Sequence, residues 1–169
     1  MYRARAWLQR YGRPLEMALW EFYFERGTKE KVIRYLSAFQ NKDGGFGHGL
    51  EPDFWLPSSS PMATWAAGQI VVEIRANPKE VMSVPAVQHT LVRNLVSYLV
   101  NTPQVQPGIW PSVLPENNLH PHAPWWHWEE HAQHGWMFNP SVELAALLIW
   151  LSPSDSPGTN LGWESLGHA

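Results

Sequence analysis

The stretch FQNKDGGFGHGLEPDFWLPSSSPMATWAAGQ, residues 39–69, decides the fold. It begins where one helical pattern ends and finishes inside another, with a loop of glycines, carboxylates and aromatic rings between them. Ser60 followed by Pro61 is typical of a helix start, because serine caps and proline suits the first helical position. The loop holds more charge and more aromatic area than a linker needs. We therefore interpret it as a structural turn that also carries candidate site residues.

Helical patterns lie on both sides of this loop. Apolar residues recur at helical spacing, and no segment alternates at period two as a half-buried strand would. The expected helices span about 13–26, 28–40, 62–75, 85–100 and 140–151. With Thr28 as a further N-cap and Gly27 as a stop, the pattern predicts an all-α fold of about six helices.

These helices are of two kinds. The segment 85–100 is amphipathic, with an apolar stripe and a polar opposite face. The segments 62–75 and 140–151 are apolar around most of their circumference and are expected to be enclosed. Their alternation predicts two layers, with amphipathic helices outside and apolar helices inside.

An internal repeat supports the two layers. The motif Gln-x3-Gly-x-aromatic occurs twice, as Gln40–Phe46 and as Gln104–Trp110, each time after a Tyr-Leu pair. A proline-started apolar helix follows both copies. We expect the glycine to adopt a positive φ, the aromatic ring to cover a helix end, and the glutamine to brace the neighbouring unit. The second loop is longer, and its excess falls within about Pro115 to Gly135.

The repeat carries a family resemblance. With its Tyr-Leu pair, it resembles the glutamine–tryptophan repeat of squalene and oxidosqualene cyclases. DGGFG at 43–47 also resembles the corresponding turn of protein prenyltransferase β subunits, and NPSVELAALLIWL at 139–151 is similar to the inner helices of that superfamily. The resemblance covers residues 32–151. It implies a terpenoid cyclase-like α/α toroid, in which outer and inner helices alternate around a central cavity.

Six helices make only about half a toroid. We expect a helical repeat domain over residues 1–151 and a polar C-terminal tail over 152–169. A missing C-terminal half or a second copy in a homodimer is expected to complete the ring. The alternative is that the exposed inner wall is itself a binding face.

Composition excludes several classes of function. The net charge of −3 and pI near 6.2 offer no basic field for nucleic acid. The absence of cysteine removes disulfides and thiolate chemistry. No apolar run approaches the ~20 residues that span a bilayer, and no signal peptide is recognisable, so a cytoplasmic protein is expected. The eleven tryptophans suit helix contacts and ligand walls.

The activities of the superfamily do not transfer with the fold. The three aspartates, Asp43, Asp53 and Asp155, do not form the Asp-x-Asp-Asp motif with which squalene-type cyclases protonate substrate. They do not form the aspartate clusters that hold magnesium in other terpene enzymes either, and the zinc-binding cysteine of the prenyltransferases is absent. The sequence therefore leaves open whether the protein is an enzyme, and it identifies no cofactor.

The first candidate site is the loop 43–55. His48, Glu51 and Asp53 are the candidate catalytic residues, because two neighbouring carboxylates act as acid and base when burial separates their pKa values. In the alternative interpretation these acids only brace the turn, with Asp43 as its cap.

The second candidate site is HPHAPWWHWEEHAQHGW, residues 120–136, within the longer loop. His127 and His131 frame an H-x-x-E-H pattern, and on a helix they would lie one turn apart and bind a metal. The alternative is an aromatic lid over a ligand. The candidate ligand-binding residues are Trp55, Trp110, Trp125, Trp126, Trp128 and Trp136.

Three functions follow as hypotheses. The first is a terpenoid cyclase-like or prenyltransferase-like scaffold that binds, and in an enzyme processes, an apolar or amphipathic small molecule in an aromatic-lined cavity. The second is a carbohydrate-binding or polysaccharide-processing toroid, since tryptophan faces stack on sugar rings. The third is a non-catalytic module whose inner helices dock onto another chain.

Overall fold

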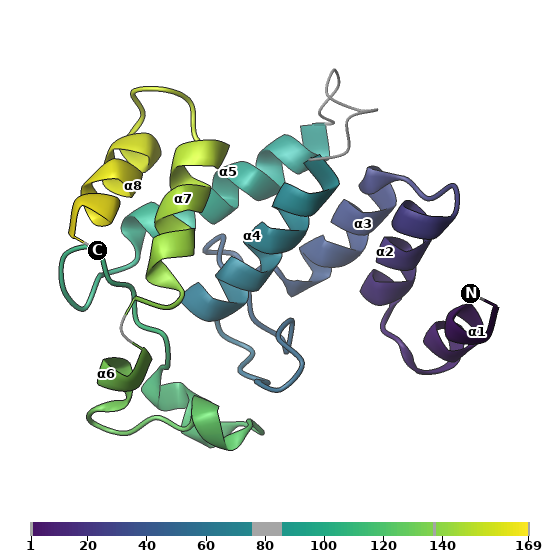
Figure 1. Cartoon of the computed structure of the whole chain (residues 1–169), viewed down its shortest axis with the longest axis horizontal. Helices are drawn as coiled ribbons and strands as arrows, with labels where there is room; N and C mark the ends of the chain where they lie inside the picture. Colours follow the sequence, from purple (N-terminus) through teal and green to yellow (C-terminus); the bar gives the residue numbers. More distant parts are fainter. Residues whose placement is uncertain (1, 76–85, 137, 169) are drawn as a thin grey trace.

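A computed structural model describes residues 2–75, 86–136 and 138–168 of the chain (Figure 1). This part of the chain contains eight α-helices and no β-strand, so the predicted all-α class is confirmed. The α-helices are α1 Tyr2–Tyr11, α2 Pro14–Phe24, α3 Lys29–Leu36, α4 Pro61–Arg75, α5 Ala86–Asn101, α6 Ala132–Trp136, α7 Ser141–Leu151 and α8 Pro157–His168. Three short 3₁₀ helices are η1 Ser37–Phe39, η2 Pro115–Leu119 and η3 Pro124–Trp126.

The helix starts follow from local chemistry. The hydroxyl of Thr28 accepts a hydrogen bond from the backbone N–H of Lys31, and α3 begins directly after it. The hydroxyl of Ser60 accepts from the N–H of Ala63 at 3.0 Å, with Pro61 as the first residue of α4. Both caps satisfy N–H groups that a helix leaves without an internal partner, and both predictions are confirmed. The expected start of α5 at Pro85 lies outside the described residues.

The helices lie in two layers (Figure 1). Along the first layer α3 contacts α5, and α5 contacts α8. Along the second layer α4 contacts α7, and the hydroxyl of Tyr23 in α2 donates to Glu73 of α4 at 2.7 Å. The chain passes from the first layer to the second through each long loop. The chain therefore alternates between the two layers.

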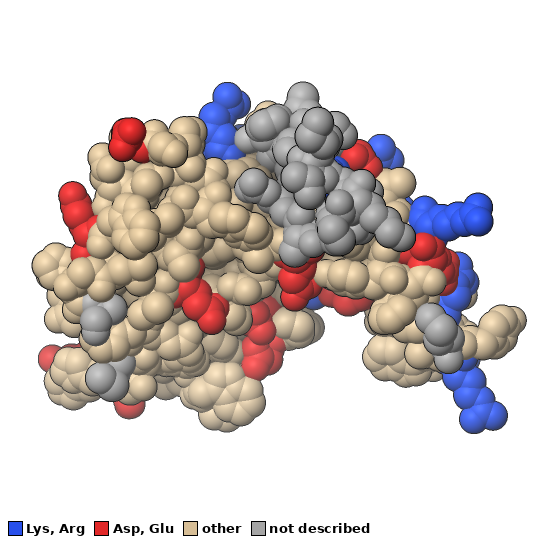
Figure 2. All heavy atoms as spheres, turned by 45° about the horizontal axis from the view of Figure 1, so that its top comes forward, with Lys and Arg blue, Asp and Glu red and all other residues tan. Residues whose placement is uncertain are grey.

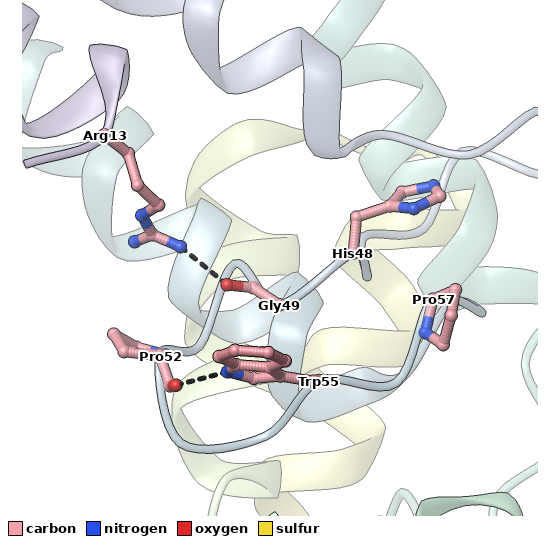
Figure 3. A pocket seen from close by; sticks show the side chains of 6 residues that line it. All are labelled: Arg13, His48, Gly49, Pro52, Trp55 and Pro57. Carbon is pink, nitrogen blue, oxygen red and sulfur yellow. Dashed lines mark hydrogen bonds between the residues drawn. The ribbon is translucent and has the colours of Figure 1, made fainter. Parts of the chain in front are cut away.

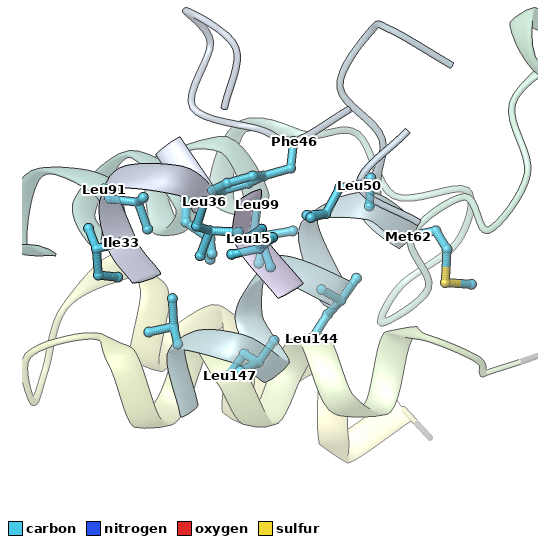
Figure 4. Close-up of a cluster of buried hydrophobic side chains, with 14 of the residues drawn as sticks. Leu15, Ile33, Leu36, Phe46, Leu50, Met62, Leu91, Leu99, Leu144 and Leu147 are labelled. Carbon is cyan, nitrogen blue, oxygen red and sulfur yellow. The ribbon is translucent and has the colours of Figure 1, made fainter. Parts of the chain in front are cut away.

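The core fills the space between the layers. Figure 4 shows Phe46 lying from its loop onto Leu36 and Leu99, while Leu144 and Leu147 approach from α7. Trp110 and Phe46 are the largest fully buried side chains of the described residues. The loop aromatics thus anchor both repeat motifs in the core, and truncating either ring to alanine is expected to cost about 3–5 kcal/mol.

The two repeat motifs have the same backbone geometry. Gly44 has φ +94° and Gly108 has φ +81°, which a side chain disfavours. A Cβ at Gly44 would lie 2.2 Å from the carbonyl oxygen of Asn94 in α5, and one at Gly108 would lie 2.8 Å from that of Ser165 in α8. In each motif the backbone of the glycine therefore lies in close contact with the next helix of the first layer.

The motif glutamines brace the same outer helices. The amide nitrogen of Gln40 donates to the carbonyl oxygens of Gly44 at 2.9 Å and of Leu91 in α5 at 3.0 Å. The amide of Gln104 accepts from the N–H of Gly108 at 2.9 Å and donates to the Ser165 hydroxyl at 3.1 Å. The expected bracing role of the glutamine is confirmed in both copies.

The motif aromatics are fixed to the inner helices by matching hydrogen bonds. The N–H of Phe46 donates to the hydroxyl of Thr64 in α4, and the N–H of Trp110 donates to the hydroxyl of Ser141 in α7, both at 3.0 Å. Both hydroxyls belong to the first turn of the inner helix. The sequence repeat is therefore a structural repeat.

The expectation of a polar tail over 152–169 is wrong for most of this segment. Residues 157–168 form α8, which packs closely on α7. The hydroxyl of Ser156 accepts from the N–H of Thr159, which repeats the Ser-Pro helix start seen before α4. At Gly162 a Cβ would lie 2.7 Å from the carbonyl oxygen of Ala145, so the glycine permits this close approach.

The inner helices are less enclosed than expected. Ala67, Val71 and Ile74 of α4 are fully buried against the outer layer. On the face turned away from that layer, Val142 and Trp150 of α7 are 41% and 45% exposed. An apolar circumference therefore did not imply burial on all sides. Among the described residues, no helix has the length and apolar character needed to cross a membrane.

Candidate functional site

The two candidate loops form one surface. The N–H of Trp55 donates to the carbonyl oxygen of Pro121 at 3.0 Å, and the N–H of Ala123 donates to that of Asp53 at 2.8 Å. These bonds lay residues 53–55 alongside residues 121–123. We call the loop 40–60 and the segment 111–136 together the rim. The sequence offered two separate sites, and the structure brings them side by side.

Asp53 holds the rim together through its side chain. One carboxylate oxygen accepts from the indole N–H of Trp126 at 2.8 Å, and the other accepts from that of Trp125 at 3.1 Å. Trp126 is buried and lies between Phe54, at 5.4 Å between ring centroids, and Trp136, at 4.7 Å and nearly parallel. A buried indole N–H needs an acceptor, and Asp53 supplies it. This geometry favours a structural role for Asp53 over the catalytic one.

Glu51 has a different environment. The side chain is half-buried, and this burial raises the pKa of its carboxyl above the ordinary value. The negative charge of Asp53 raises that pKa further, and the positive charge of Arg13 opposes the shift. The surroundings of Glu51 therefore shift its protonation equilibrium, as is common for acids at functional sites.

His48 is held in a defined orientation. Its φ is +56°, and its Nε2 lies 2.9 Å from the amide oxygen of Asn41. The amide nitrogen of Asn41 donates to the carbonyl oxygen of Pro57, which fixes the amide oxygen toward His48. Nε2 of His48 therefore carries the proton that it donates. In the neutral ring Nδ1 remains an acceptor.

A pocket of about 540 Å³ opens beside these residues (Figure 3). Figure 3 shows Trp55 lying across it below Gly49, with Arg13 and His48 on its two sides. The remaining lining residues are Pro52 and Pro57.

The walls of this pocket are fixed by hydrogen bonds. The indole N–H of Trp55 donates to the carbonyl oxygen of Pro52 at 2.7 Å, although the ring is 58% exposed. The guanidinium of Arg13, directly before α2, donates to the carbonyl oxygens of Gly49 and Leu50 and to the carboxylate of Glu16. The pocket is therefore preformed.

Arg13 was missed from the sequence. It lies 36 residues from Gly49 along the chain, and nothing in the local pattern around it indicates a contact with the loop. Only the folded arrangement of α2 against the rim identifies Arg13 as part of the site. Asn41, whose side chain orients His48, was also missed, although it lies only 7 residues away in the same loop.

The six candidate tryptophans separate into two groups. Trp110 is fully buried, and its indole N–H donates to the carbonyl oxygen of Leu99, so the expectation that it contacts a ligand is wrong. Trp126 is buried and Trp136 is stacked on it. Trp55 and Trp125 expose 58% and 60% of their surface, and Trp128 exposes 37%. The exposed group offers indole faces to a ligand.

The helical geometry expected for a metal at His127 and His131 is absent. His127 follows η3 and His131 precedes α6, so the two are not one turn apart on a helix. Nδ1 of His122 donates to the carbonyl oxygen of His120, and Nε2 of His122 lies 3.1 Å from Nδ1 of His127. The imidazole of His131 instead stacks on that of His134.

Within residues 2–75, 86–136 and 138–168, no cluster of three or more His, Asp or Glu side chains has the arrangement to hold a metal ion. The H-x-x-E-H pattern therefore lacks both its helix and a third ligand in this part of the chain.

A second hollow lies on the inner wall between α4 and α7. It has a volume of about 450 Å³ and is lined by Gln69, Val72, Glu143, Ala146, Leu147 and Trp150. The carboxylate of Glu143 accepts from Gln69 at 3.1 Å and from the indole of Trp65. This wall is mostly apolar, with one carboxylate whose partners lie on α4.

Comparison with protein-family models, with curated proteins and with solved structures gives no match to this chain.

Proposed function

We propose that the protein is a partial α/α-toroid scaffold that binds an amphipathic small molecule, of which a sugar ring is the best-fitting class, in the rim pocket. The observation that carries this proposal is Trp55, whose indole is 58% exposed while its N–H is already bonded to Pro52. A large aromatic ring is costly to expose and is held here without freedom to fold away. It offers a ligand a flat apolar face.

The surroundings of Trp55 suit a ligand with polar edges. A sugar ring has one face of C–H groups, which stack on an indole, and a rim of hydroxyls, which need hydrogen-bond partners. Nδ1 of His48 provides an acceptor on one side of the pocket, and the half-buried carboxyl of Glu51 lies in the same loop. Pockets of several hundred Å³ with few oriented polar groups are typical small-molecule sites.

A wholly apolar ligand fits the rim less well. Such a molecule gains most from an enclosed apolar cavity, because transfer from water drives its binding. Of the aromatic rings expected to line that cavity, Trp110 and Trp126 are packed in the protein interior. The rim pocket is open and partly polar, which supports the carbohydrate alternative among the hypotheses from the sequence.

A glycan array probed with the full chain tests the proposal. For any sugar that binds, calorimetry then compares the unaltered protein with Trp55→Ala and with Phe24→Ala, a control that removes a similarly exposed ring from α2, where Phe24 is 56% exposed. Trp55→Ala is expected to weaken binding by at least about tenfold, since a stacked aromatic contributes 1 kcal/mol or more. An array without a binder, or equal affinities for all three proteins, would refute the proposal.

A second candidate function rests on the inner wall. The hollow between α4 and α7 exposes Val72, Ala146 and Trp150, which suits an apolar molecule such as an isoprenoid chain. Native mass spectrometry after incubation with farnesol would show a retained ligand, and Ala146→Glu would abolish it by placing a charge in the apolar hollow. If the Ala146→Glu protein retained the ligand as well as the unaltered protein does, the inner wall would be excluded as the binding site.

A further inference from the structure

Charge is segregated along the chain. All twelve Lys and Arg residues lie within residues 1–93, which also carry nine acidic residues and have a net charge of +3. Residues 94–169 contain no Lys or Arg and have a net charge of −6, which with +3 gives the total of −3. Their acidic residues are Glu116, Glu129, Glu130, Glu143, Asp155 and Glu164.

The basic and the acidic parts of the chain lie at opposite ends of the molecule. Figure 1 places α1 at one end of the longest axis and α8 at the other. In Figure 2 basic side chains gather toward the α1 end, and the lower outline is hollowed between the two ends. The molecule is therefore an arch with a basic end and an acidic end.

The basic end carries an uncovered aromatic face. Helix α1 buries none of its residues, and Trp7 and Tyr11, one turn apart, are 60% and 64% exposed. Arg3 and Arg10 lie on the same side at helical spacing, and both are exposed. The helix contacts α2, and its Arg5 forms an ion pair with Glu25, directly after α2.

The acidic end carries a matching face on α8. The buried residues of this helix, Gly158, Gly162 and Ser165, form the side toward the rest of the protein. Trp163 is 62% exposed and lies beside the exposed Glu164. A Cβ at Gly167 would meet no atom within 4 Å, so the end of this face is open.

We infer that α1 of one copy packs on α8 of a second copy, with the reverse contact formed at the same time about a two-fold axis. Within one chain the two faces lie at opposite ends of the arch and cannot meet. A second copy brings arginine against glutamate and ring against ring at both ends, and two identical contacts close the assembly. Each face is thus covered by the opposite end of the second copy.

The inference does not depend on sugar binding at the rim, and its failure would leave that proposal untouched.

Sedimentation equilibrium on the full chain tests the inference. The expected mass is twice 19.4 kDa at about 0.1 M salt. The dissociation constant is expected to rise several-fold at about 1 M, where the screening length falls from about 10 Å to about 3 Å. A monomer at both salt concentrations, a salt-independent dimer or an open series of larger oligomers would each overturn it.

Charge reversal makes the test specific. The double variant Arg3→Glu/Arg10→Glu and the variant Glu164→Lys are each expected to weaken self-association at least about tenfold, because like charges then meet. An equimolar mixture of the two is expected to dimerise again, since opposite charges meet at both contacts. Arg34→Glu, which changes an exposed arginine on α3, serves as the matched control. A mixture that stays monomeric would contradict the head-to-tail contact.

Cross-linking provides a readout that does not depend on charge. The chain has no cysteine, so Ala4→Cys on α1 and Gly167→Cys on α8 each introduce a single thiol at an exposed position. A mixture of these two variants is expected to form a disulfide-linked dimer under mild oxidation, and a mixture of Ala4→Cys with Lys42→Cys is not. Equal cross-linking in both mixtures would argue against the proposed pairing.

Discussion

Replacement of Gly44 by alanine is the sharpest test of the repeat geometry. A side chain at φ +94° is disfavoured by roughly 1–2 kcal/mol. Its Cβ would lie 2.2 Å from the carbonyl oxygen of Asn94, well inside van der Waals contact, so α5 must move by about 1 Å. Helix α5 is held by the buried Leu91 and Leu95, and displacing such a packed element costs about 1–3 kcal/mol.

The two terms together predict a loss of about 2–5 kcal/mol, which is a large part of the stability of a small protein. Urea unfolding followed by circular dichroism measures this loss, and thermal unfolding should show a decrease of roughly 5–15 °C in Tm. An unchanged m-value would show that the loss arises in the folded state.

Two further glycines make the reasoning falsifiable. Gly108 has a similar φ of +81° but a looser contact of 2.8 Å with Ser165, so alanine there should cost less, about 1–3 kcal/mol. Gly135 in α6 has open space around it, and alanine there should stabilise by about 0.5–1 kcal/mol. The argument would be refuted if the Gly44→Ala protein were within about 0.5 kcal/mol of the unaltered protein in stability. It would also be refuted if the Gly108→Ala protein were less stable than the Gly44→Ala protein.

The other predictions concern the rim and α8. Asp53→Ala should cost about 1–3 kcal/mol by leaving the buried indole N–H of Trp126 without an acceptor, and the near-UV circular dichroism of the stacked rings should fall; an unaltered spectrum would contradict the bracing role. Glu51→Gln should raise the Tm at pH 7, because the ionised carboxyl with its raised pKa opposes folding; this gain should vanish as the pH falls through that pKa and Glu51 is protonated, whereas a gain that grows at low pH would reverse the sign. Gly162→Ala should destabilise α8 and Gly167→Ala should stabilise it by about 0.5–1 kcal/mol, as compared by thermal unfolding, and equal effects would contradict the close packing on α7.

The sequence predicted those parts of the fold that depend on local chemistry. Ser60 with Pro61 marks a helix start whatever surrounds it, and the glutamine and glycine of the repeat act within five residues of each other. Helix α8 was missed because its three glycines read as loop, although Ser156 repeats the cap. Its helical state depends on packing against α7, which no local pattern reports.

The candidate site was predicted less well, for a related reason. The acids and rings of the rim were identified correctly as unusual, but the partner of Asp53 lies 73 residues away at Trp126. Trp110 was misassigned because the same indole serves equally as a core residue and as a ligand wall. The metal pattern at His127 did not fold as a helix because Pro124 begins a short 3₁₀ turn just before it.

The bond between Asp53 and Trp126 also constrains how the protein folds. Until residue 126 has left the ribosome, Phe54 has no Trp126 ring to pack on and Asp53 has no indole donors. Contacts between residues far apart in sequence form late, because closing long loops costs entropy. The rim should therefore be the last part of the first repeat to become ordered during synthesis, and a ligand that binds there would select chains whose second repeat is already complete.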